Sequence, residues 1–530
     1  MINFLKKISE NDIYLDIIDG ELKLFSENEN IDKKLLQEIK EKKVEITSFL
    51  KENRGFNSSK NEEIPTVKLD DNYALSDAQK RLWILSQFEE SSVAYNMPNN
   101  IELNGSYDLI SFEKAIIHVI ERHEILRTVF VKDDNDEVKQ KILTIEELNF
   151  KVNYKDYRGK ENPKEDVLAF INEDSNIPFD LEKGPLLRAS LLQTGDNSYV
   201  FYYNMHHIIS DGWSKNVLSK DILSSYEAYV SGSMPDLPPL KIQYKDYASW
   251  QVGQLDTASY KEHREYWLDN LSGDLPVLNF PSYQPRPKMK TYNGRSLSTY
   301  ISSEATEGLT NYCQERGGSL FMGLLAVWNI LCYKYTSQRD MIIGTPVAGR
   351  NHSSLEDQIG FYVNTLALRN QINPEDSFDT FYGQVKDNTL RSYKHQDYPF
   401  DRLVEELDVT NDRSRSAIFD VVLALQNTGE KINGIEISEE EIDTISLSGP
   451  VTSKFDLEVF FQEVNDHLYV KVNYNTDVYD SVMVEGLMVH YKELLVSLMS
   501  SFEKPLKDVE YLPSAERLEL LSGFNATDVA

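Results

Sequence analysis

The sequence predicts a mixed α/β (or α+β) protein, with a large two-lobed body behind a small N-terminal unit. The chain has 530 residues, which is too long for one ordinary hydrophobic core. Helical and strand patterns alternate from Leu75 to about Leu512 without a strong break, as in an α/β body of two lobes. Before this body, residues 53–72 are polar and show no periodicity, which is typical of a linker.

The N-terminal unit, residues 1–52, combines a hairpin pattern with a helical one. Apolar and polar residues alternate over 13–25 on both sides of Asp19-Gly20, a dipeptide that favours a tight turn between two strands. The next segment spaces its apolar residues as one face of a helix does, at Leu35, Ile39, Ile46 and Leu50. We therefore divide the chain into an N-terminal unit at 1–52, a linker at 53–72, a body at 73–512 with lobes at about 73–245 and 246–512, and a polar end segment at 513–530.

Composition narrows the partners that the chain can bind. Its formal net charge is −31, from 86 acidic and 55 basic residues. Because nucleic acids and anionic membranes are bound by clustered Lys and Arg, we expect neither as a partner. The same charge mildly disfavours a free polyanionic cofactor, and we expect no cofactor bound in this chain.

Three features of the sequence favour a cytoplasmic protein. Cys313 and Cys332 provide neither a disulfide framework nor a metal-ligand spacing. The opening residues, 1–14, lack the long apolar core of a signal peptide. The most apolar stretch, residues 319–335, is interrupted by Asn329 and is short for a membrane span, so we predict a buried helix there.

An adjacent histidine pair stands out in MHHIISDGWS, because the chain has only nine histidines. Residues 199–207 have the aromatic and β-branched content of a strand, and apolar residues recur at near-helical spacing over 213–230. The turn between them therefore joins a strand to a helix. In a strand, the side chains of His206 and His207 would point to opposite faces, so we expect one of the two to be structural.

The residues after the pair have local roles of their own. Asp211 and Ser214 can each cap the following helix, Asp211 can also pair with an arginine from elsewhere, and Gly212 can adopt a backbone conformation closed to other residues. Spacing alone leaves three interpretations of the histidines: proton transfer or positioning of a nucleophile, a satisfied core pair, or metal binding. Metal binding is disfavoured, because the spacing suggests no third ligand.

Beyond its spacing, HHIISDG matches the HHxxxDG signature of the condensation domains of nonribosomal peptide synthetases, relatives of chloramphenicol acetyltransferase. Six further segments resemble motifs of that family, in the same order along the chain. They are LSDAQKRLWIL (75–85), RHEILRTVF (122–130), YKDYASWQ (244–251), IGFYVNTLALR (359–369), HQDYPFD (395–401) and NDRSRSAIFDVV (411–422). Seven ordered motifs are far more specific than HHxxxDG alone.

The resemblance implies two chloramphenicol acetyltransferase-like lobes in a V-shaped pseudo-dimer, with the histidine turn inside a tunnel that is open at both ends. Each mouth is expected to receive the 4'-phosphopantetheine arm of a carrier protein. The donor arm would bring an acyl or peptidyl thioester and the acceptor arm an aminoacyl thioester. The implied activity is formation of an amide bond between the two.

The resemblance also implies roles for the residues of the turn. His207 matches the family's functional histidine, which either takes the proton of the attacking ammonium or stabilises the tetrahedral species. His206, Asp211 and Gly212 match mainly structural positions. Asp211 matches the residue that pairs with the first arginine of RHEILRTVF, here Arg122, and no metal is expected.

The other motifs contain residues that could suggest chemistry but have simpler interpretations. We expect His123 to be a packing residue and His395, in HQDYPFD, to be a helix cap or a contact between lobes. The aromatic residues of 244–251 are expected in the core. Asn364 is expected to line the tunnel.

Details of the motifs indicate a subtype. A DxxxxD pattern is absent, so heterocycle formation is not expected, and no second histidine motif of the dual epimerising kind precedes Arg122. Residues 92–98 (SVAYNMP) and 359–369 resemble the subtype that joins an L-configured donor to an L-configured acceptor. Against an epimerisation domain stands GFNATD at 523–528, which resembles the entry to a downstream adenylation domain in the same polypeptide.

Residues 1–52 resemble the N-terminal docking domains of the tubulysin-synthetase type. The resemblance implies that the hairpin edge captures a C-terminal peptide of an upstream synthetase by strand addition. The alternative is an appendage that stabilises the chain and binds nothing. For the body, the alternatives to peptide-bond formation are acyl transfer from free acyl-CoA and a noncatalytic platform that recruits partners.

Overall fold

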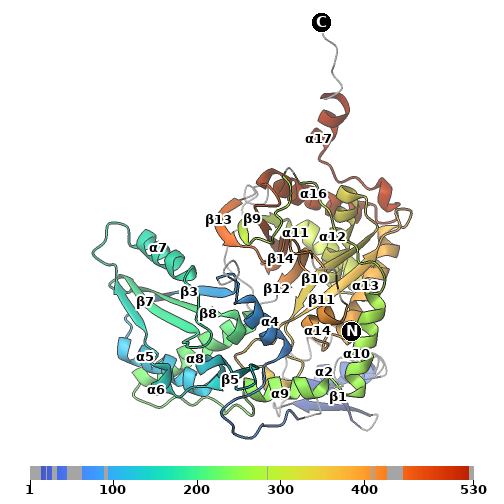
Figure 1. Cartoon of the computed structure of the whole chain (residues 1–530). Helices are drawn as coiled ribbons and strands as arrows, with labels where there is room; N and C mark the ends of the chain where they lie inside the picture. Colours follow the sequence, from blue (N-terminus) through green and yellow to red (C-terminus); the bar gives the residue numbers. More distant parts are fainter. Residues whose placement is uncertain are drawn as a thin grey trace. The chain divides into compact units, whose positions relative to one another are not determined.

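The fold is taken from a computed structural model of the chain (Figure 1). The structure describes residues 13–18, 21–26, 33–43, 63–88, 93–282, 284–407, 409, 412–426 and 446–523. Contacts between residues divide the chain into two units. The smaller unit comprises Met1–Glu63 with Asn351–Leu355, and the larger comprises Ile64–Arg350 with Glu356–Ala530. The boundary at 63/64 lies within the predicted linker.

The smaller unit contains the predicted hairpin and helix. Strands β1 (Ile13–Ile18) and β2 (Glu21–Ser26) pair antiparallel, with Ile13 opposite Ser26 and Ile18 opposite Glu21. Helix α2 (Lys33–Glu41) follows, and its Leu35 and Ile39 are buried as the helical pattern predicted. Asp19-Gly20, Ile46 and Leu50 lie outside the described residues.

The first lobe of the larger unit is built on a four-stranded sheet in the order β3-β8-β7-β6. Its strands are β3 (Asn96–Asn104), β6 (Asn153–Asp156), β7 (Leu187–Gly195) and β8 (Ser198–His206). The central strands β7 and β8 are almost continuously buried, since their aromatic and branched residues pack on both faces. A separate ribbon pairs β4 (Thr128–Lys132) with β5 (Val138–Ile142).

Helices of the first lobe carry the histidine turn and its neighbours. They are α4 (Asp77–Leu85), α5 (Leu109–Arg122), α6 (Ile145–Leu148), α7 (Pro163–Ser175) and α8 (Gly212–Val230). Helices α5 and α8 pack against each other, as the view in Figure 1 also shows. Helix α9 (Tyr244–Gln254) spans the predicted lobe boundary at 245/246, and α10 (Ala258–Asn270) follows it.

The second lobe contains a seven-stranded mixed sheet in the order β11-β10-β12-β14-β15-β9-β13. Its strands are β9 (Asn293–Ile301), β10 (Asp340–Val347), β11 (Asn364–Gln371), β12 (Val421–Gln426), β13 (Ser446–Thr452), β14 (Leu457–Val464) and β15 (His467–Asn475). Strand β12 pairs parallel with β14, whereas β15 pairs antiparallel with β14 on one side and with β9 on the other.

Helix α12 (Leu320–Thr336) lies at the centre of the second lobe's core. Its first thirteen residues, Leu320–Cys332, are all buried, because its apolar side chains cover the whole circumference. This confirms the buried helix predicted from residues 319–335, and no helix of the described chain is long and apolar enough to cross a membrane. The remaining helices of this lobe are α11 (Ser303–Glu315), α13 (Phe378–Lys394), α14 (Phe400–Glu406), α16 (Ser481–Ser500) and α17 (Ser514–Leu518).

Candidate active site

The histidine turn joins a strand to a helix, as predicted. Strand β8 ends at His206, residues His207–Ile209 form one turn of 3-10 helix, and α8 begins at Gly212. Because the strand stops at His206, the next ring does not continue the strand alternation. His207 begins a new turn, and its backbone N–H donates to the carbonyl of Tyr95 at 2.8 Å.

His206 is buried and binds the backbone of its own turn. Its side chain is 1% exposed, and its Nδ1 accepts a hydrogen bond from the backbone N–H of Ile208 at 3.1 Å. The rings of Tyr95 and Phe179 flank it, with centroids at 6.5 and 6.1 Å. Burial lowers the pKa of His206 to about 3, so the imidazole is neutral at physiological pH and holds the turn as an acceptor.

His207 presents one nitrogen to the protein and keeps the other available. Its Nδ1 lies 2.7 Å from the carbonyl oxygen of Ser210, and since a carbonyl only accepts, Nδ1 carries the proton. Its Nε2 therefore bears the lone pair and has no hydrogen-bond partner among the described residues. The Phe361 ring packs edge-on against the imidazole at 4.7 Å.

The surroundings of His207 keep its imidazole neutral. Burial is the main cause that lowers its pKa well below the ordinary value, and the positive charge of Lys454 lowers it further. The hydrogen bond to Ser210 opposes this shift without reversing it. The result is a half-buried, neutral histidine with a fixed tautomer, which suits an acceptor of a transferred proton.

Asp211 fixes the turn from the other side. It is the N-cap of α8, and its Oδ1 accepts from the backbone N–H of Ser214 at 2.8 Å and from the Ser214 hydroxyl at 2.7 Å. Its Oδ2 accepts from the backbone N–H of Tyr362 at 3.1 Å. Arg350 Nη2 lies 3.1 and 3.2 Å from the two carboxylate oxygens, and both side chains of the pair are almost fully buried.

The predicted pairing of Asp211 with Arg122 is wrong. Arg122 Nε donates to Asp221 at 3.0 Å, and His123 Nε2 lies 3.0 Å from the same carboxylate oxygen. Arg122 ends α5, which packs along the middle of α8, so it meets a carboxylate about 15 Å beyond the N-cap at 1.5 Å of rise per residue. Pairing with an arginine from elsewhere is confirmed, but that arginine is Arg350.

Gly212 does not have the backbone conformation that was expected. Its φ is outside the left-handed region, and it occupies the ordinary first position of α8. A Cβ built on Gly212 would meet no heavy atom within 4 Å, and the residue is exposed. The position is therefore open space beside the turn.

The predicted tunnel residue Asn364 binds a neighbouring loop. Its Nδ2 donates to the carbonyls of Gln396 and Tyr398 at 2.8 and 2.7 Å, and its Oδ1 accepts from the backbone N–H of Phe400 at 2.9 Å. Both the nitrogen and the oxygen of the Asn364 amide thus bind this loop. Its contact with a tunnel stays a prediction.

The remaining histidines of the motifs are structural, as predicted. His123 is 1% exposed and packs at the end of α5. His395 is the C-cap of α13, stacks on the Tyr266 ring at 4.2 Å, and accepts the indole N–H of Trp267 at its carbonyl. The aromatic rings of Tyr244 and Tyr247 are buried in the core as predicted, whereas Trp250 of the same segment is only half-buried.

Two residues near the turn were missed by sequence reasoning. Arg350 stands nine residues before the IGFYVNTLALR motif, and Lys454 precedes β14; neither belongs to a recognised segment. The local signal for Arg350 in the sequence was the neighbouring Gly349. In the structure this glycine has a φ of 65°, and its missing Cβ leaves room for the backbone of Tyr362. Such a signal indicates close packing but not an ion pair.

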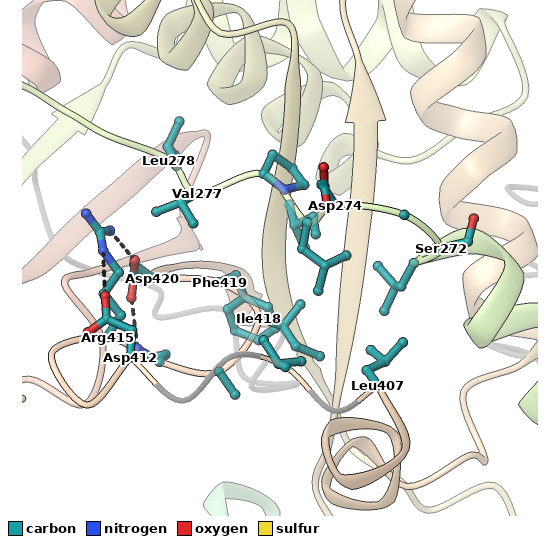
Figure 2. Close-up of a pocket in the computed structure, with 18 residues that line it drawn as sticks. Ser272, Asp274, Val277, Leu278, Leu407, Asp412, Arg415, Ile418, Phe419 and Asp420 are labelled. Atoms are coloured by element: carbon teal, nitrogen blue, oxygen red, sulfur yellow. Dashed lines mark hydrogen bonds and ion pairs between the residues drawn. The ribbon is translucent and has the colours of Figure 1, made fainter.

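A separate cavity lies in the second lobe, with a volume of about 530 Å³. Figure 2 shows its lining, in which apolar side chains gather around Ile418 and Phe419 and the Arg415–Asp420 ion pair lies at one side. None of its lining residues belongs to the histidine turn. Among the described residues, no cluster of His, Cys, Asp and Glu could hold a metal ion.

Comparisons with known proteins support the family resemblance. A family model described as Condensation domain matches residues 69–521. Bacitracin synthase 1 of Bacillus licheniformis is 39% identical over 456 residues, which are 86% of this chain and 8% of that protein. Gramicidin S synthase 2 of Brevibacillus brevis is 35% identical over 467 residues, which are 88% of this chain and 10% of that protein. The chain thus spans a small part of the length of both relatives.

The fold is also similar to solved structures. A four-domain nonribosomal peptide synthetase bound to AMP and glycine aligns with a TM-score of 0.73 at 24% identity, over 85% of this chain and 35% of that chain. Together with the two sheets described above, this confirms the predicted mixed α/β fold class of the chloramphenicol acetyltransferase type.

Proposed function

Since this chain belongs to the condensation domain family of nonribosomal peptide synthetases, we propose that it joins a donor acyl or peptidyl thioester to an acceptor aminoacyl thioester through an amide bond. Both substrates are held on the 4'-phosphopantetheine arms of carrier proteins, and no further cofactor takes part. The observation that carries the proposal is His207, whose Nδ1 is bound to Ser210 while Nε2 keeps its lone pair.

The reaction needs little chemical activation, because a thioester is already reactive and a neutral amine is a good nucleophile. The acceptor nitrogen attacks the donor carbonyl carbon, a C–N bond forms, and the π electron pair moves to the oxygen. His207 Nε2 takes the proton that the nitrogen loses. The oxygen pair then re-forms the carbonyl, the C–S bond breaks, and the thiolate of the donor arm takes the proton from the imidazolium. Holding the two arms together supplies most of the rate enhancement.

At His207 the protein fixes which ring nitrogen exchanges a proton. Because Nδ1–H stays on the Ser210 carbonyl, only Nε2 can exchange a proton with substrate. A low pKa means that the imidazolium is short-lived and returns its proton readily. Asp211 and Arg350 act on this step indirectly, by fixing the turn that carries the imidazole.

The finer substrate assignment follows from the motifs. The segments 92–98 and 359–369 favour an L-configured donor and an L-configured acceptor. An adenylation domain would follow in the same polypeptide after residues 523–528. The strands β1 and β2 pair with each other, and an outer edge of this hairpin would bind the C-terminal peptide of the upstream synthetase by strand addition.

The test is mass spectrometry of the acceptor carrier. A donor carrier loaded with each of the common L-amino acids in turn is mixed with the protein and an L-aminoacyl acceptor carrier. We expect the acceptor to gain the mass of one aminoacyl residue, and His207→Ala to abolish most of this gain while the protein stays folded. Extension by free acyl-CoA at the same rate would favour the CoA-dependent alternative. No extension with carriers that are shown to bind would favour the recruitment platform.

The docking role has its own test. Removing residues 1–52 should weaken transfer from a donor carrier that is attached to the upstream C-terminal peptide, and should leave transfer from a small soluble donor thioester unchanged. Equal losses for the two donors would contradict docking, because they would indicate general damage to the enzyme.

A further inference from the structure

A lysine of the second lobe reaches Tyr95, the residue whose carbonyl holds the histidine turn. Lys454 lies in the connection between β13 and β14, and its side chain is half-buried. Its ammonium is 5.1 Å from the centre of the Tyr95 ring. The carbonyl of that same Tyr95 accepts the backbone N–H of His207, and its ring packs beside His206. One residue of the first lobe thus touches both the ammonium and the reactive turn.

The connection that carries Lys454 is held firmly. The backbone N–H of Ser453 donates to the Tyr292 carbonyl at 3.1 Å, and the Ser453 hydroxyl donates to the Phe455 carbonyl at 2.7 Å. The backbone N–H of Asp456 donates to the Asp420 carbonyl at 3.0 Å. Lys454 therefore has a defined position, unlike a lysine on a surface loop.

The ammonium of Lys454 lacks a close counter-ion. Within the described part of the chain, no carboxylate oxygen lies within 4 Å of it, although the chain carries 86 acidic residues. The acid whose charge acts on it, Glu458, is 7% exposed and accepts the backbone N–H of Lys454 at 3.3 Å. The half-buried Arg286 and the buried Arg350 both have carboxylate partners.

A half-buried cation without a close counter-ion is costly, and such groups gather at functional sites. Burial is the main cause that lowers the pKa of Lys454 to about 8; Glu458 opposes this shift and Lys215 adds to it. The arrangement is destabilising by itself. It becomes favourable when negative charge arrives beside the ammonium.

We propose that Lys454 stabilises the negative charge that develops on the donor carbonyl oxygen when the acceptor amine attacks. The inference rests on the function proposed above, in which the π electron pair of the thioester carbonyl moves to its oxygen before the C–S bond breaks. Lys454 exchanges no proton in this step. It supplies a fixed positive charge at the place where His207 takes the proton from the attacking nitrogen.

The binding test uses a stable mimic of the charged intermediate. A pantetheine-linked phosphonate monoester, tetrahedral and anionic, is compared with the matching carboxamide, planar and neutral, by calorimetry. Wild-type protein should bind the phosphonate more tightly. Lys454→Met, which keeps the apolar stem, should weaken phosphonate binding roughly 10- to 100-fold and change carboxamide binding less than about twofold. Lys454→Arg should restore most of the phosphonate affinity.

A matched control is Lys290. It is also half-buried, burial also lowers its pKa to about 8, and it donates to the Ser416 hydroxyl at 2.7 Å. Lys290→Met should leave the preference for the phosphonate unchanged. Equal loss of both ligands in Lys454→Met would assign Lys454 to structure and overturn the proposal, as would a wild-type protein that does not prefer the phosphonate.

Turnover separates this inference from the function on which it rests. In the carrier assay, Lys454→Met should lower kcat and leave KM for the acceptor carrier nearly unchanged. If wild-type protein extends no acceptor carrier, the proposed function fails, and the phosphonate preference then reports only on an anion site at Lys454. If wild-type protein is active and Lys454→Met retains its full kcat, the role of Lys454 is refuted alone.

Discussion

Removing Arg350 should destabilise the larger unit through the carboxylate that it leaves behind. The side chains of Arg350 and Asp211 are 2% and 0% exposed, so neither charge can turn to water. Arg350→Met deletes two contacts of Nη2 with the carboxylate, one with the Ser214 hydroxyl, and the bond from Nη1 to the Gln358 carbonyl. It also removes the guanidinium from the Tyr362 ring, 4.2 Å away.

The expected cost follows from what remains. Asp211 keeps its hydrogen bonds from Ser214 and Tyr362 but loses its cation, and breaking a buried ion pair by removing one partner costs about 3–5 kcal/mol. Urea unfolding, followed by tryptophan fluorescence and by circular dichroism, measures this change. Coincident transitions of the two probes are needed before the free energy of unfolding is compared.

A double-mutant cycle tests the pairing itself. Asp211→Asn and Arg350→Met should be coupled by on the order of 2 kcal/mol, whereas Asp211→Asn and Arg122→Met should add within about 0.5 kcal/mol. Lys183→Met, at the exposed pair with Asp180, should leave the urea midpoint unchanged. Coupling of Asp211 to Arg122 instead of Arg350 would refute the arrangement of the turn.

Three further predictions concern the surroundings of the turn. Burial lowers the pKa of His206 to about 3, so the folded protein binds fewer protons than the unfolded chain from about pH 6.5 downward. The free energy of unfolding should therefore fall as the pH drops through this window, by at most about 1.4 kcal/mol per pH unit. Melting curves of His206→Asn should depend less steeply on pH than those of the wild-type protein, and equal slopes would contradict this. Asn364→Ala loses three hydrogen bonds to residues 396–400, so unfolding should become easier by roughly 2–4 kcal/mol and limited proteolysis should cut this loop sooner; unchanged cleavage would argue against it. Gly360→Ala would place a Cβ 2.2 Å from the Tyr244 ring and should lower the free energy of unfolding by about 1–3 kcal/mol. Gly383→Ala, in open space within α13, should not destabilise the protein. Melting temperatures that rank the two variants in the opposite order would overturn this reasoning.

Features with local signals could be predicted from the sequence. The strand, the turn and the helix around HHIISDG follow from residue pattern, and the capping role of Asp211 follows from its place one residue before the helix. The buried helix α12 follows from an apolar run with no polar face. The hairpin β1-β2 follows from alternation around one dipeptide.

Features that depend on distant residues could not be predicted in this way. Arg122 and Arg350 are equally able to pair with a carboxylate, and only the packing of α5 along α8 decides that Arg122 meets Asp221. Lys454 gives no pattern of its own, because its importance arises from the Tyr95 ring of the other lobe. Gly212 shows the opposite error, since glycine suggested an unusual backbone where the helix start is ordinary.

The sharing of Asp211 between the cap of α8 and Arg350 has a consequence for synthesis of the chain on the ribosome. The arginine is translated 139 residues after the aspartate. At 5–20 residues per second this is a delay of roughly 7 to 28 s, during which the nascent first lobe has its cap but not its counter-ion. The histidine turn can therefore reach its final form only after Arg350 of the second lobe has emerged, and a ribosome-bound fragment that ends before Arg350 should hold the turn in a hydrated, unfinished state.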